Sequence, residues 1–167
     1  MAIYTSRYAN RTLRSGKYYA VGISLGKPRF PLGYIVAEQC YELAPNYSMM
    51  KLTDDRFKEE YIRKLETFGV EKTIKTIREM EARAEKSGKD LVLLCFEDIR
   101  KPGQWCHRTL FAEWWKEKTG ETIEELEEAT PLKEKKTKGK TVVGEEIGCS
   151  GQMSMFDIFE MEEMSFI

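Results

Sequence analysis

The stretch that most restricts the fold is a short apolar run near the middle of the chain, Leu91–Leu94 (LVLL). The polar tetrapeptide Ser87-Gly88-Lys89-Asp90 comes directly before it, and Glu97 and Asp98 follow shortly after. A continuous apolar run between polar segments is typical of a strand that is buried on both faces, as in a parallel sheet. We therefore expect an α/β fold, with a small parallel or mixed sheet flanked by helices.

The residues after this run predict a helix that begins with reactive side chains. Four apolar residues fall on one helical face: Leu110, Phe111, Trp114 and Trp115. Gly120 is a typical stop for such a helix. Cys106-His107-Arg108 then lies at the helix start, facing the carboxyl end of the strand, which is where open α/β sheets bind ligands. A helix start also lowers the pKa of a thiol.

The remaining patterns predict the other elements. Strands are expected at Met1–Thr5 and Lys17–Ser24, helices at Asp54–Phe68 and Val70–Lys86, and either a short helix or an edge strand at Thr122–Glu128. Leu25–Tyr34 holds two prolines and two glycines, so we expect an irregular loop there.

The charge distribution, rather than the net charge of −1, indicates a type of partner. No acidic residue precedes Glu38, whereas six basic residues do: Arg7, Arg11, Arg14, Lys17, Lys27 and Arg29. Such a region suits phosphate or nucleic acid better than a membrane. We take Arg7, Lys27 and Arg29 as candidates for substrate or phosphate binding. Phe30 and Tyr34 would either stack on a base or cap the core.

The cysteines and the amino terminus indicate a cytoplasmic protein. Cys40, Cys95, Cys106 and Cys149 show no disulfide framework. The first residues, MAIYTSRYANRTLRSG, are too polar for a signal peptide, and no apolar run approaches membrane length. We expect free thiols, a reducing compartment and no membrane contact.

The candidate catalytic residues are Glu97, Cys106, His107 and Arg108, and more than one chemistry fits them. Cys106 could be a thiolate nucleophile with His107 or Arg108 nearby. Neighbouring residues of one helix point about 100° apart, which makes His107 a poor base for Cys106 unless Cys106 precedes the helix. Alternatively, Glu97 acts as nucleophile or general base on a sugar or base, while His107 and Arg108 hold a phosphate.

A third chemistry is zinc binding by Cys95, Cys106 and His107, with Cys40 or Cys149 as the fourth ligand. The chain has no C-x-x-C pair, so we expect no metal and no cofactor. The plainest alternative is that Cys95 and Cys106 only fill space in the core and His107 caps the helix.

Two of these motifs carry a family resemblance. Cys95-Phe96-Glu97 and Cys106-His107-Arg108 resemble the Cys-x-Glu and Cys-His-Arg signature of the Domain of Unknown Function four-eight-eight family. The family's Asp-Val-Arg-x-x-Pro loop corresponds to Gly22–Pro28, which lacks that Asp and Arg. The resemblance covers residues 1–128 and implies an α/β sandwich and an enzyme whose reaction is not established.

The carboxyl-terminal part carries a separate signal. The composition of residues 129–148 predicts a charged, flexible linker, and residues 149–167 are predicted to form a tail peptide. Gln152-Met153-Ser154-Met155-Phe156 resembles the peptide that binds the bacterial sliding clamp, with Met in place of Leu twice. The alternative is an amphipathic tail that docks on its own domain.

Together these features predict an enzyme of DNA metabolism from a bacterium or phage. Its substrate would be nucleic acid or a nucleotide, and its tail would tether it to the replication clamp. The rival interpretation is a non-catalytic DNA-binding adaptor or clamp inhibitor.

Overall fold

The computed structural model describes residues 1–132, and these residues form a wholly parallel five-stranded sheet. The strands in chain order are β1 (Ile3–Arg7), β2 (Tyr18–Gly22), β3 (Val36–Gln39), β4 (Asp90–Cys95) and β5 (Glu124–Glu125). Their spatial order, β3-β2-β4-β1-β5, places β4 at the centre. The expected α/β class and the buried central strand are confirmed.

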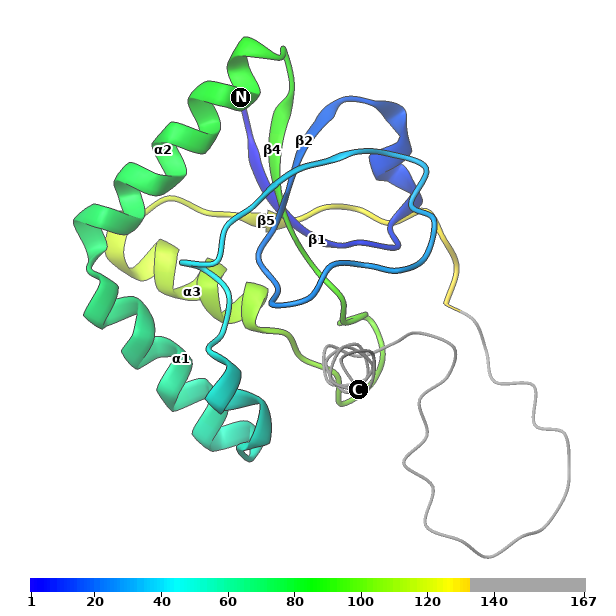
Figure 1. Ribbon diagram of the computed structural model, residues 1–167. Coiled ribbons are helices and arrows are strands. Elements are labelled where there is room, and N and C mark those ends of the chain that lie inside the picture. Colours follow the sequence, from blue (N-terminus) through cyan, green and yellow to red (C-terminus); the bar gives the residue numbers. More distant parts are fainter. Residues whose placement is uncertain (133–167) are drawn as a thin grey trace, which may run out of the picture.

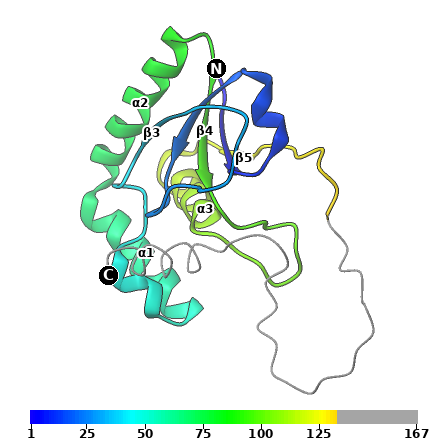
Figure 2. The same ribbon diagram turned by 45° about the vertical axis from the view of Figure 1, so that its right-hand side comes forward.

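Three helices cover one side of the sheet. They are α1 (Asp54–Phe68), α2 (Val70–Lys86) and α3 (His107–Thr119). Figures 1 and 2 show them together on one side, whereas the short 3-10 helix η1 (Arg11–Ser15) lies on the other. A second 3-10 helix, η2 (Tyr47–Lys51), leads into α1. The segment 23–35 connects β2 to β3 without a helix or strand, as its prolines and glycines predict.

The core follows the apolar periodicity of the sequence. The residues of β4 from Leu91 to Cys95 are completely buried, because helices cover one face and η1 with its neighbouring loops covers the other. Each helix buries one apolar stripe. These stripes are Phe57, Tyr61 and Leu65 in α1, Ile77, Met80 and Ala84 in α2, and Phe111, Trp114 and Trp115 in α3.

The parallel pairing brings three strand ends to one edge of the sheet. Arg7 at the end of β1 pairs with Cys95 at the end of β4, and Gly22 at the end of β2 pairs with Leu94. A side chain at Gly22 would collide with the hydroxyl of Tyr8 and the amide of Gln39, so glycine permits this close packing. Helix α3 begins at the same edge: its N-cap residue is Cys106, and its first residue, His107, lies beside Cys95 at the end of β4. Polar and reactive side chains from two strand ends and one helix start therefore converge at this edge.

Two short strands differ from the sequence-based expectation or settle an open one. Strand β3 was not predicted, and the ambiguous Thr122–Glu128 segment contains the edge strand β5. The clamp-like motif Gln152–Phe156 and most of the linker 129–148 lie outside the described residues, so the division into domain, linker and tail stays a prediction. Within residues 1–132, no helix is long and apolar enough to cross a membrane.

Candidate functional site

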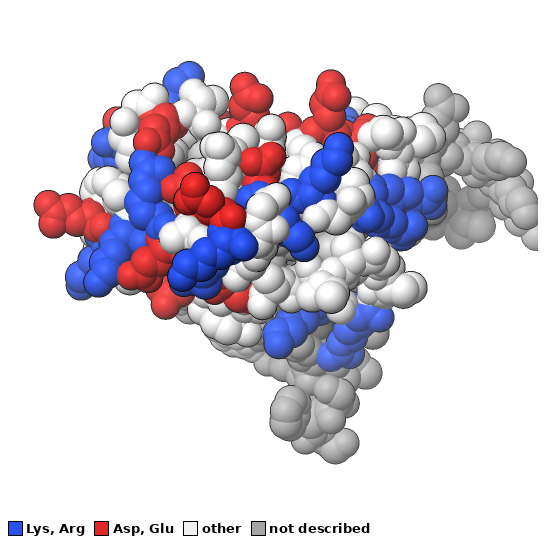
Figure 3. Space-filling model, turned by 90° about the horizontal axis from the view of Figure 1, so that it is seen from above, with Lys and Arg blue, Asp and Glu red and all other residues white. Residues whose placement is uncertain are grey.

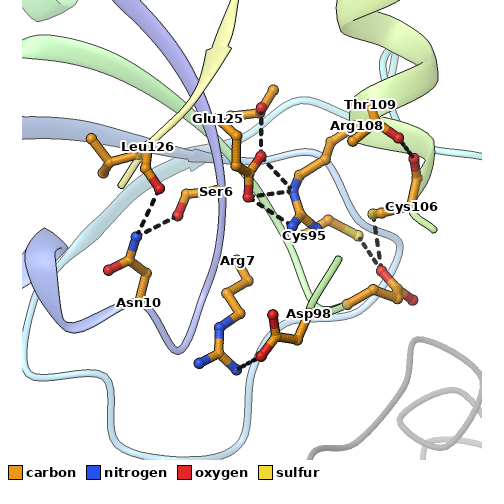
Figure 4. Close-up of polar contacts among 12 residues, drawn as sticks. Ser6, Arg7, Asn10, Cys95, Asp98, Cys106, Arg108, Thr109, Glu125 and Leu126 are labelled. Carbon is orange, nitrogen blue, oxygen red and sulfur yellow. Dashed lines mark hydrogen bonds and ion pairs between the residues drawn. The ribbon is translucent and has the colours of Figure 1, made fainter. Parts of the chain in front are cut away.

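A buried cluster of polar and reactive side chains occupies the carboxyl edge of the sheet. Cys95 is the last residue of β4, Cys106 occupies the N-cap position of α3 without a side-chain capping hydrogen bond, and His107 and Arg108 are the first two residues of that helix. None of these four side chains is more than marginally accessible, and the exposed fraction of Arg108 is 0%. Figure 4 shows Cys95, Cys106 and Arg108 gathered between β4 and the start of α3.

The Glu97 carboxylate joins the two thiols. Its Oε2 atom accepts a hydrogen bond from Cys106 Sγ at 3.0 Å and another from Cys95 Sγ at 3.3 Å. Two of the predicted catalytic residues, Glu97 and Cys106, are thus in direct contact, although they are nine positions apart in the sequence. The structure therefore places the proposed nucleophile and the proposed acid or base in one centre.

The imidazole of His107, the chain's single histidine, has a defined orientation. Its Nε2 lies 2.7 Å from the carbonyl oxygen of Ile23, which can only accept a hydrogen bond, so Nε2 carries a proton. Its Nδ1 faces the sulfurs, 3.6 Å from Cys95 Sγ and 3.8 Å from Cys106 Sγ. The Tyr61 ring packs edge-on against the imidazole and holds its plane.

The guanidinium of Arg108 is only partly paired. Its Nε and Nη2 donate to the two carboxylate oxygens of Glu125 at 3.1 and 2.8 Å. Glu125 is held in turn by the hydroxyl of Thr5 at 2.7 Å. The Nη1 group of Arg108 is buried and has no hydrogen-bond partner among the described residues. An unpaired buried donor is costly, so this N–H group is available for an acceptor from a ligand.

The electrostatics of the cluster make Cys106 the more acidic of the two thiols. Burial opposes ionisation of Cys106, but a hydrogen bond from Cys95 and the charge of Arg108 lower the Cys106 thiol pKa well below its ordinary value. Burial and the neighbouring Cys106 raise the pKa of Cys95. The same two causes raise the pKa of Glu97 to about 7. The direction at Cys106 is the one expected for a thiol at a helix start, but here it comes from Cys95 and Arg108.

Arg7, a predicted phosphate contact, belongs to an ion-pair network beside the cluster. Its Nε donates to Glu128 at 2.7 Å, and its Nη1 lies 3.5 Å from Asp98. Arg100 holds the other side of Asp98 through two hydrogen bonds of 2.9 Å. Because the Arg7 side chain is 9% exposed and paired, phosphate binding there would require it to leave these partners.

Lys27 and Arg29 lie on the exposed loop that follows β2, and no ion pair within residues 1–132 involves them. Phe30 and Tyr34 of this loop pack against the core, and the Tyr34 hydroxyl donates to the Tyr8 carbonyl at 2.7 Å. This arrangement favours the core-capping interpretation of the two aromatics. On the face seen in Figure 3, basic side chains are interspersed with acidic and neutral ones.

The sequence did not predict the two hydrogen-bond acceptors that orient Arg108 and His107. They are the Glu125 carboxylate that holds Arg108 and the Ile23 carbonyl that holds His107. The acidic run Glu124-Glu125 was visible, but its pairing with an arginine 17 residues earlier depends on where β5 joins the sheet. A backbone carbonyl leaves no signal in the sequence.

The three groups proposed as zinc ligands do converge. The sulfurs of Cys95 and Cys106 and a ring nitrogen of His107 all lie within 4.8 Å of one another. Cys40, offered as a fourth ligand, is buried beside Glu42 after the end of β3 and does not belong to this converging group, and Cys149 lies outside the described residues. The expectation that no metal binds was based on the missing C-x-x-C pair, and the convergence of these ligands weakens that argument.

No protein-family model matches the chain, and comparisons with curated proteins and with solved structures also find no match. The resemblance to the Domain of Unknown Function four-eight-eight family therefore stays a prediction that rests on the Cys-Phe-Glu and Cys-His-Arg motifs.

Proposed function

We propose that the chain is an enzyme that processes nucleic acid or nucleotides, with Glu97, Cys106, His107 and Arg108 as its reaction centre. One observation carries this proposal: the Glu97 carboxylate lies 3.0 Å from the Cys106 thiol inside a buried cluster at the carboxyl edge of a parallel sheet. Burying a carboxylate, two thiols, an imidazole and a guanidinium together is expensive, and such clusters are typical of active sites.

The contacts suggest a role for two of these residues. The unpartnered Nη1 of Arg108 would donate to an anionic or carbonyl oxygen of the substrate. Glu97, in contact with both sulfurs, would exchange a proton with the reacting group.

The substrate class is proposed from charge. The loop that carries Lys27 and Arg29 leaves the sheet at the edge where the cluster lies, since it follows the carboxyl end of β2. Two exposed lysine and arginine side chains near a buried site suit a phosphate-bearing substrate. Free thiols at Cys40, Cys95 and Cys106 suit a cytoplasmic setting, which belongs to the same proposal.

The clamp tether is proposed from the tail sequence alone. Gln152-Met153-Ser154-Met155-Phe156 offers a polar anchor followed by apolar side chains, the arrangement of a groove-binding peptide. Binding of a replication clamp would bring the enzyme to DNA, and this agrees with the proposed substrate class.

The reaction centre is tested with the full chain and three labelled substrates: DNA, RNA and mixed nucleotides. We expect the natural protein to form a new product or covalent adduct with at least one of them. Glu97→Gln should reduce this product at least about 100-fold, because proton transfer contributes roughly that much or more to a reaction.

The matched control is Glu124→Gln, which makes the same change at an exposed position of β5. This variant should react like the natural protein. The proposal fails if Glu97→Gln keeps full activity while folded. If no substrate reacts although the protein binds DNA, the non-catalytic adaptor is correct instead.

A further inference from the structure

We infer that Cys95, Cys106 and His107 bind a zinc ion at the carboxyl edge of the sheet. The Nδ1 atom of His107 lies 3.6 Å from Cys95 Sγ and 3.8 Å from Cys106 Sγ. Tetrahedral zinc holds sulfur at about 2.3 Å and nitrogen at about 2.0 Å, which separates a sulfur from a nitrogen by about 3.6 Å. The nitrogen is therefore already spaced from each sulfur as it would be around the metal, and the two sulfurs lie within 4.8 Å of each other.

The orientation of His107 supports the same inference independently of these distances. Metal-bound histidines usually donate their second ring N–H to a carbonyl or carboxylate, which fixes the ring. Here the Ile23 carbonyl receives Nε2–H at 2.7 Å and leaves the lone pair of Nδ1 directed at the two sulfurs. Ile23 itself is buried just beyond β2, and its backbone N–H donates to the Leu94 carbonyl of β4 at 2.9 Å, so the sheet holds this support in place.

The donor set selects the metal. Two thiolates and one neutral imidazole are soft to intermediate ligands, which favour zinc over magnesium or calcium. Two thiolate charges also neutralise a divalent cation, so the buried site would carry no net charge from the metal and its ligands. The guanidinium of Arg108 remains paired with Glu125 and need not move.

Three protein ligands leave a fourth position open. This number is typical of catalytic zinc sites, in which water or substrate takes the remaining place. Glu97 touches both sulfurs and so lies next to the ion. The inference adds a metal to the proposed reaction centre and in that sense rests on the proposed function. Its evidence is ligand geometry, so a test can disprove zinc binding without disproving the proposed reaction, and the reverse.

The first test measures metal content and thiol protection in the full natural chain. The protein is stripped with a chelator under reducing conditions, reloaded with zinc, and weighed by native mass spectrometry. We expect one zinc per chain. Alkylation followed by peptide mapping should then show Cys95 and Cys106 reacting at least tenfold more slowly with zinc than without, and Cys40 reacting equally in both forms.

The second test uses variants. Cys106→Ser should weaken zinc binding ~100-fold or more, whereas the matched control Cys40→Ser should bind zinc like the natural protein. The inference is overturned if the natural chain retains no zinc, or if zinc protects Cys40 rather than Cys95 and Cys106. The alkylation result needs no variant, so poor folding of Cys106→Ser would not leave the question open.

Discussion

At the scale of single residues, two buried arginines differ in how completely their guanidinium groups are paired, and this difference distinguishes a structural role from a functional one. Arg7 is paired with Glu128 and Asp98, and this arrangement explains why it can be buried. Arg108 is completely buried but keeps its Nη1 without a partner among the described residues. The sequence predicted a functional role for both, and their pairing makes Arg108 the stronger candidate.

Asp98 gives a testable dependence of stability on pH. Hydrogen bonds from Arg100, and further the charge of Arg7, hold its pKa below the ordinary value despite partial burial. A lowered folded-state pKa contributes stability above the unfolded pKa of about 3.9, and this contribution is lost as the pH falls through the folded value. Asp98→Asn should therefore lower the free energy of unfolding by about 2 kcal/mol at pH 7, measured by urea denaturation.

The same measurement at pH 2 should give a smaller difference between Asp98→Asn and the natural protein, because the contribution of the charged carboxylate decreases once the pH is below the unfolded pKa of about 3.9. Asp55→Asn, an exposed carboxylate in the first turn of α1, is the control and should change stability by only a few tenths of a kcal/mol. An equal loss at both pH values would show that Asp98 acts through packing rather than charge.

At the scale of elements, the sequence predicted those that have a clear periodicity. The ranges expected for the first two helices agree with α1 and α2, because their apolar stripes are regular. Strand β3 (Val36–Gln39) was missed because it follows a proline-rich loop and contains two polar residues among four. Strand β5 consists of two glutamates, which have no strand propensity, so only its pairing with β1 creates it.

The position of the candidate site was predictable at this scale, but its internal contacts were not. A buried strand followed by a helix start placed Cys95, Cys106 and His107 at one edge. The contact of Glu97 with both thiols depends on how the loop between β4 and α3 folds. The sequence did not predict zinc, because the C-x-x-C rule describes ligands within one short segment, whereas here the ligands come from the ends of two elements.

At the scale of the whole molecule, residues 1–132 form one sheet-centred unit, and the tail should be separable from it. A chain that ends at Lys140 should melt within a few degrees of the intact chain.

A peptide spanning Cys149–Glu160 should bind a bacterial sliding clamp by itself, and Phe156→Ala should remove most of that affinity, because apolar anchors dominate such binding. Scanning calorimetry of the intact and truncated chains measures the melting temperatures, and titration calorimetry of the peptides with the clamp measures the affinities.

The alternative for the tail makes the opposite prediction. If the tail docks on its own domain, its removal exposes apolar surface and the truncated chain melts much earlier, while the free peptide binds no clamp. Such a result would remove the clamp from the proposed function but would leave the reaction centre untouched.

The central claim is that the chain holds a preformed centre in which His107 Nδ1 faces two thiols. Because His107 is the single histidine, nitrogen NMR of the full chain gives one imidazole signal set that needs no assignment. The structure predicts a proton on Nε2, held by the Ile23 carbonyl, in both the zinc-free and the zinc-loaded protein, with the Nδ1 resonance shifting when zinc is added. A proton on Nδ1 and none on Nε2, together with no response to zinc, would contradict the account.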